Sequence, residues 1–113
     1  DRPLAGTGAD AFLAGSARHQ NGATVLFAHD LPLELAAELG IAGLVLCAAL
    51  YAAACRSLWR ARRAVAGWLL GPAAAAFLVS SLVDWPWHLA GAGAVWALAI
   101  GGISHRVRAA DSE

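Results

Sequence analysis

Apolar and polar residues occur in long blocks along this chain. Residues 39–55, 64–83 and 89–103 contain no charged side chain, and the charges gather between and outside these blocks. A bilayer core about 30 Å thick needs roughly 20 apolar residues to cross it as a helix. The blocks also lack the polar face that the surface helices of soluble proteins carry. The pattern therefore predicts transmembrane helices, which we place at 31–57, 64–83 and 87–106.

The remaining residues are more polar and complete the expected architecture. Residues 1–30 contain spaced glycines and are expected to form an extracytoplasmic loop segment, with a short helix near 10–18. Residues 107–113 are expected to form a short cytoplasmic tail. The predicted fold is all-α and integral to a membrane, with about three transmembrane helices preceded by this loop segment.

The first long helix has a clear start signal. Asp30 is a good N-cap, and Pro32 suits the first helical turn, where its missing N–H costs little. A helix from Leu31 to Arg56 would be roughly 39 Å long, which exceeds the hydrocarbon core. The first turns, with Glu34 and Glu38 on one face, are therefore expected to project into the interface or the water.

Composition agrees with a membrane protein and excludes several classes of site. The chain is 59% apolar and 14% charged, against roughly a quarter charged in average domains. Its net charge of zero predicts no nucleic-acid partner. Cys47 and Cys55 would lie about 12 Å apart on a helix, which is too far for a disulfide. No zinc-ligand spacing is present, and we expect neither a metal nor a cofactor.

The arginines predict the orientation of the chain. All eight basic residues are arginines, and six of them lie at 56–63 and 106–108, which fall on one side of a hairpin with three spans. The positive-inside rule places that side in the cytoplasm. Residues 1–34 and 84–88 would then face the periplasm of a bacterial inner membrane. The chain contains no Met, so we expect that Asp1 is a cut and that an upstream part of the protein is missing. A soluble bundle of very apolar helices is the alternative.

Two groups of residues on the predicted periplasmic side have possible roles in binding. Gly6 and Gly8 permit positive φ and close approach to a ligand phosphate, or they belong to a plain loop. Arg2 and Arg18 add positive charge, and arginine pairs well with phosphate. Asp84 lies at a span boundary, where an ionisable residue is either functional or part of an interfacial loop with neighbouring tryptophans.

The start of the first helix holds the residues best suited to acid–base chemistry. His29 precedes the helix, where a histidine is either a general base or an ordinary surface residue. Glu34 and Glu38 would orient His29 or bind sugar hydroxyls, or they would simply solvate the helix end.

Three segments together resemble one family. Residues 3–8 read Pro-Leu-Ala-Gly-Thr-Gly, with Phe12 following, and residues 28–44 read Ala-His-Asp-Leu-Pro-Leu-Glu-Leu-Ala-Ala-Glu-Leu-Gly-Ile-Ala-Gly-Leu. Residues 82–86 read Leu-Val-Asp-Trp-Pro, which is similar to an Asp-aromatic-Pro turn between late helices. These segments, in this order, resemble the O-antigen ligase/polymerase superfamily of membrane glycosyltransferases.

The resemblance implies a function for the complete protein. Such enzymes transfer a glycan from undecaprenyl diphosphate to an acceptor, which is lipid A-core in ligases, a repeat unit in polymerases, or a protein hydroxyl in protein O-oligosaccharyltransferases. His29 matches the histidine proposed to activate the acceptor hydroxyl, while position 30 holds Asp where the family has Asn. The family's important arginines lie upstream of its glycine segment, and its members have many more spans. The chain alone is therefore expected to be inactive.

A non-catalytic role in the membrane is the remaining class of function. A scaffold or transporter fragment would also contain apolar helices and contact membrane lipids. Transporters usually carry ionisable residues in mid-span. The middle of each predicted span, within residues 39–55, 64–83 and 89–103, carries no charged side chain, which counts against that interpretation.

Overall fold

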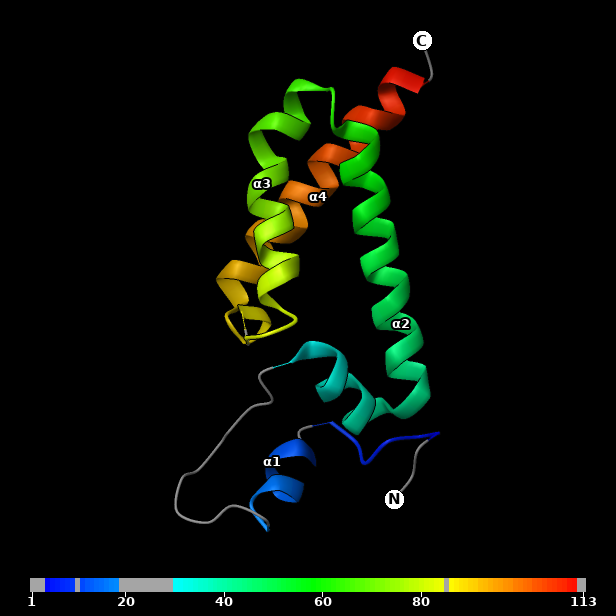
Figure 1. Cartoon of the computed structure of the whole chain (residues 1–113), viewed down its shortest axis with the longest axis vertical. Coiled ribbons are helices and arrows are strands. Elements are labelled where there is room, and N and C mark those ends of the chain that lie inside the picture. Colours follow the sequence, from blue (N-terminus) through cyan, green and yellow to red (C-terminus); the bar gives the residue numbers. More distant parts are fainter. Residues whose placement is uncertain (1–3, 10, 19–29, 85, 112–113) are drawn as a thin grey trace. The chain divides into compact units, whose positions relative to one another are not determined.

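The computed structural model describes residues 4–9, 11–18, 30–84 and 86–111, and every regular element within these ranges is helical. The all-α prediction is confirmed for this part of the chain. The elements in order are α1 (Ala11–Ser16), α2 (Leu31–Ala61), α3 (Val65–Ser80), the short 3₁₀ helix η1 (Pro86–His88) and α4 (Ala90–Asp111), as Figure 1 shows.

Helix α2 is long and apolar enough to cross a membrane. Its most apolar 18-residue stretch has a mean hydropathy of 2.0, and only 17% of that stretch is buried within the chain. Helix α3 is also apolar but has 16 residues, fewer than a perpendicular crossing requires. Among the described residues, α2 is thus the one candidate span that combines sufficient length with sufficient hydropathy.

The first long helix was predicted to be continuous, but α2 is broken at Gly40. This residue has φ 65° and ψ −147°, a conformation that glycine adopts far more readily than other residues. The break divides α2 into residues 31–39 and 41–61, and Figure 1 shows the corner between them. The second segment is roughly 31 Å long, close to the thickness of a hydrocarbon core. The residues that exceed this thickness, 31–39, therefore precede the break at Gly40 and run in a different direction.

The chain forms two compact units. The first unit comprises the described parts of Asp1–Ala49 and Ser81–Trp85, and the second comprises those of Leu50–Ser80 and Pro86–Glu113. Helix α2 contributes its first residues to the first unit and its last turns to the second.

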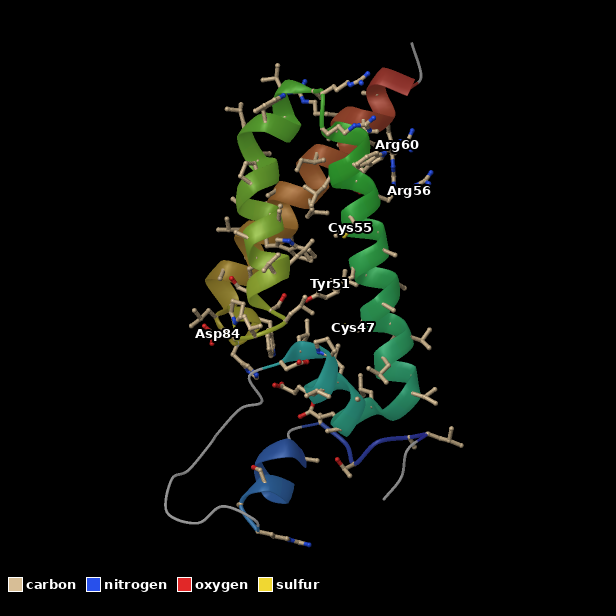
Figure 2. All side chains as sticks on the ribbon, in the orientation of Figure 1. Cys47, Tyr51, Cys55, Arg56, Arg60 and Asp84 are labelled. Carbon is tan, nitrogen blue, oxygen red and sulfur yellow. The ribbon has the colours of Figure 1, made fainter. Side chains whose placement is uncertain are left out.

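Aromatic side chains join the helices of the second unit at several points. Trp96 of α4 stacks on Phe77 of α3, with ring centroids 5.3 Å apart, and its indole N–H donates to the Ala74 carbonyl at 3.2 Å. Tyr51 extends from α2, and its hydroxyl donates to the Leu78 carbonyl at 3.1 Å (Figure 2). Small residues fill the space between these helices, and Ala54, Ala61 and Ala74 are almost completely buried.

Many large apolar side chains point away from the protein interior. Trp68 is 74% exposed and Leu98 is 76% exposed, and others on α2, α3 and α4 are similar. A water-soluble helical domain would cover such surface, because each exposed side chain of this kind forfeits about 1.5–3 kcal/mol of burial. The helices thus present apolar surface that is suited to lipid or to further apolar helices.

Candidate functional site

Most of the residues proposed as a site from sequence lie in the first unit. Gly6, Gly8 and Arg18 come from the segment before α2, Glu34 and Glu38 come from α2, and Asp84 comes from the turn after α3. His29 and Arg2 lie outside the described residues, so their roles stay predictions. The geometry below concerns the segments around them.

The glycine segment is attached to the end of the first part of α2. The Thr7 amide donates to the Ala37 carbonyl at 2.9 Å, and the Gly8 amide donates to the Glu38 carbonyl at 2.9 Å. The Thr7 hydroxyl also donates to the Ala37 carbonyl at 2.9 Å. Carbonyls at a helix end need donors from elsewhere. The glycine segment supplies them beside the break at Gly40.

This attachment explains why glycines occur here. Gly6, Gly8 and Gly40 all have positive φ. A Cβ on Gly40 would lie 2.7 Å from the backbone of Leu4 and Gly6, and a Cβ on Gly6 would collide with the backbone of Glu38. The two backbones therefore touch without side chains between them. The amides of Thr7 and Gly8, which a phosphate would need, already donate to helix carbonyls.

The start of α2 is capped as the sequence predicted. The Asp30 carboxylate accepts a hydrogen bond from the Leu33 amide at 2.9 Å, and the Asp30 carbonyl accepts one from the Glu34 amide at 3.0 Å. Asn and Asp cap helices about equally well, so the Asp at position 30 keeps the local geometry that an Asn would give. This cap orients the chain immediately after His29.

The turn that contains Asp84 is joined to the same helix start. The Leu31 amide donates to the Ser81 carbonyl at 3.0 Å, and Ser81 is only 1% exposed. A free amide at a helix N-terminus is thereby satisfied by a segment fifty residues away. The bond anchors the turn at 81–84, on which Asp84 is exposed (Figure 2).

The two glutamates differ in exposure although they share a helix face. Glu34 is 8% exposed, whereas Glu38 is half-buried. A carboxylate that only solvated a helix end would remain in water, so that alternative does not describe Glu34. Burying an acid costs free energy unless partners compensate, which makes Glu34 the more distinctive of the pair. The positive end of α2 favours a carboxylate in this first turn.

Arg18 and the tryptophan turn are less closely integrated with this cluster. Arg18 is exposed in the turn after α1. Trp87 and His88 belong to η1 in the second unit, where their rings lie 5.6 Å apart. Within the described ranges, no three His, Cys, Asp or Glu side chains are grouped closely enough to hold a metal ion.

Two structural residues of this region were not identified from sequence. Gly40 breaks α2, and its signal was a glycine inside a long helical pattern, the usual mark of a possible helix end. Ser81 acts through its backbone carbonyl, which no side-chain pattern reveals. Together they bring the glycine segment and the Asp84 turn to opposite ends of residues 31–39.

The first unit therefore joins the segments on which the family resemblance rests. Its described residues offer carboxylates beside a helix N-terminus, an arrangement suited to binding hydroxyl groups. A general base would have to come from the adjoining His29. No protein-family model, curated protein or solved structure matches this chain.

Proposed function

We propose that this chain is the C-terminal part of an O-antigen ligase-like membrane glycosyltransferase. The complete protein would transfer a glycan from undecaprenyl diphosphate to an acceptor outside the cytoplasm, with lipid A-core as the preferred acceptor. The chain would supply the acceptor-activating segment, and helices that precede it in the parent protein would supply the rest of the site.

The convergence of three sequence segments carries this proposal. The glycine segment, the segment that follows His29 and the turn at Asp84 resemble separate motifs of one family, and backbone hydrogen bonds join all three in the first unit. Motif likenesses that arose by chance would have no reason to meet at one short helix. Glu34, which is 8% exposed, adds a buried carboxylate to the same short helix.

The proposed mechanism uses His29 as a general base. The imidazole takes the proton from the acceptor hydroxyl while the hydroxyl oxygen forms a bond to the anomeric carbon of the glycan. The bond between that carbon and the phosphate oxygen breaks, and undecaprenyl diphosphate leaves with the electron pair. Arginines, including any in helices that would precede this chain in the parent protein, would stabilise the charge of the leaving diphosphate. Glu34 would orient the histidine or a sugar hydroxyl.

Membrane insertion is part of the same proposal. The length and hydropathy of α2 support it, as do the exposed apolar side chains of α3 and α4. In the proposed topology the first unit faces the periplasm of a bacterial inner membrane, and the arginine-rich ends of α2 and α4 face the cytoplasm.

Replacing His29 tests the chemistry. In the complete parent protein, expressed in a host deficient in ligation, His29→Ala should abolish the long-chain lipopolysaccharide ladder while undecaprenyl-linked polymer accumulates. Loss of a general base typically lowers a rate on the order of 10²–10⁴-fold, enough to remove the ladder from a gel. Membrane levels of the variant are followed by immunoblot.

His105→Ala is the matched control, because His105 lies on α4 in the second unit and belongs to no proposed site. It should leave the ladder intact. A full ladder from His29→Ala would remove His29 from the mechanism. If the wild-type protein restores only a polymerase-deficient host, or only the glycosylation of a protein, the acceptor assignment changes to that activity.

A further inference from the structure

The second unit contains a groove lined by arginines, to which the proposed transfer reaction gives no role. It has a volume of about 190 Å³ and lies between the last turns of α2 and the last turns of α4. Its lining residues are Ala53, Arg56, Ser57, Arg60, Ser104, Val107 and Arg108. Figure 2 shows Arg56 and Arg60 on α2 near the end of α4.

Positive charge is concentrated on this groove by helix geometry. Arg56 and Arg60 are four residues apart and share one face of α2, while Arg108 approaches from α4. No carboxylate is among the described lining residues. Guanidinium groups suit phosphate because their planar N–H donors bind two oxygens at once. Three of them line this one groove.

The groove also contains hydroxyl groups and an apolar side. The Ser104 hydroxyl donates to the Ser57 hydroxyl at 3.0 Å, which joins α4 to α2. The lining changes from Ala53, inside the uncharged block, to Arg60 about two helical turns later. An occupant with both an apolar part and a phosphate fits this gradient better than free phosphate does.

We propose that this groove binds the phosphate headgroup of an anionic phospholipid. Basic pockets between helices on the cytoplasmic side of a membrane are suited to such headgroups, since they pair the phosphate while the acyl chains lie along the helices. The inference rests on the membrane location proposed above and is independent of the transfer chemistry. The binding would fix the arginine-rich ends of α2 and α4 at the membrane surface.

Native mass spectrometry of the full chain tests the site. The chain is released from micelles that contain equal amounts of phosphatidylglycerol and phosphatidylcholine, and the two lipid-bound forms are counted. Phosphatidylglycerol should dominate on the wild-type chain. Arg56→Gln should reduce its preference about fivefold, the effect expected from one arginine near a charged lipid. The triple replacement Arg56→Gln, Arg60→Gln and Arg108→Gln should abolish the preference.

The matched control removes the same charge outside the groove, through Arg62→Gln, Arg63→Gln and Arg106→Gln. These residues do not line the groove, and Arg62 instead lies over the Trp59 ring at 4.1 Å. The control should keep the preference for phosphatidylglycerol, with helix content verified by circular dichroism. Equal loss in both triple variants, or loss in neither, would overturn the proposal.

A last experiment distinguishes a lipid headgroup from free phosphate as the occupant of the groove. Inorganic phosphate replaces chloride at equal ionic strength while the bound phosphatidylglycerol is measured. Retention of the lipid supports a headgroup site. Displacement of the lipid would show that the groove selects soluble phosphate and would overturn the lipid assignment. A chain extracted from membranes without detergent would instead refute the membrane location itself.

Discussion

Gly40 shows how one residue determines the shape of the first unit. Its positive φ turns the chain between residues 31–39 and 41–61, and its bare α-carbon lets the backbone of Leu4 and Gly6 pass at contact distance. Any other residue would strain the backbone and also displace the glycine segment. The close approach of the two backbones thus explains why glycines occur in this region, without any role in binding phosphate.

Gly40→Ala should therefore detach the glycine segment. The strained backbone alone costs about 1–3 kcal/mol, and the new methyl group would also push Leu4 and Gly6 away. Without the Ala37 and Glu38 carbonyls as acceptors, the amides of Thr7 and Gly8 should exchange hydrogen for deuterium faster. Hydrogen exchange followed by mass spectrometry of the peptide containing residues 4–9 measures this.

Gly101→Ala is the control for this experiment. Gly101 lies inside α4, and a methyl group there would meet no atom within 4 Å. Exchange in residues 4–9 should not change, and helix propensity should stabilise α4 by up to about 1 kcal/mol. Unchanged exchange in Gly40→Ala would contradict the explanation of the corner.

At the scale of elements, hydrogen bonds from distant segments complete the helix ends. Residues 31–39 are too few to be stable alone, since isolated helices shorter than about 12 residues are marginal in water. Asp30 and the Ser81 carbonyl satisfy amides at its start, and Thr7 and Gly8 satisfy carbonyls at its end. The short helix therefore persists because of tertiary contacts.

The end of α3 shows the same principle in the second unit. The Leu78 carbonyl lies within the last turn of α3, where helical donors are missing, and the Tyr51 hydroxyl donates to it. Away from water such a carbonyl is costly to leave unpaired.

Tyr51→Phe should destabilise the second unit by about 0.5–1.5 kcal/mol, the value of one hydrogen bond. The ring is kept, so packing should change little. Thermal unfolding in detergent, followed by circular dichroism, should show a midpoint lowered by a few degrees. Cys55→Ala is a suitable control, because Cys55 lies one turn further along α2 and is exposed. An unchanged midpoint for Tyr51→Phe would show that the bond contributes nothing to stability.

At the scale of the molecule, the proposed topology places the turn between α2 and α3 on the opposite side of the membrane from the turn at 81–84. The turn between α2 and α3 carries arginines, whereas the turn at 81–84 belongs to the unit proposed to face the periplasm.

Cysteine labelling tests this arrangement in whole cells. In a background with Cys47→Ala and Cys55→Ala, Val83→Cys should react with a membrane-impermeant maleimide added from the periplasmic side. Arg63→Cys should react only after the inner membrane is permeabilised. Both positions are exposed, so access to the reagent depends on the membrane. Reaction of both positions before permeabilisation would exclude the hairpin topology.

The sequence alone predicted those features that depend on local physics. Uncharged blocks predicted helices, and the Asp30 cap followed from the preference of a helix N-terminus for an oxygen acceptor. The length and hydropathy of α2 likewise depend on composition and not on neighbours.

The tertiary structure decided what depends on contacts between distant segments. The backbone of the glycine segment packs against Gly40 at the break in α2, and Glu34 is buried although it is an acidic residue near a helix start. Arg108 lines the same groove as Arg56 and Arg60 because the last turns of α4 lie beside the last turns of α2. A linear pattern records the hydrophobicity of each residue, whereas these features depend on which backbone or side-chain atoms lie next to it in space.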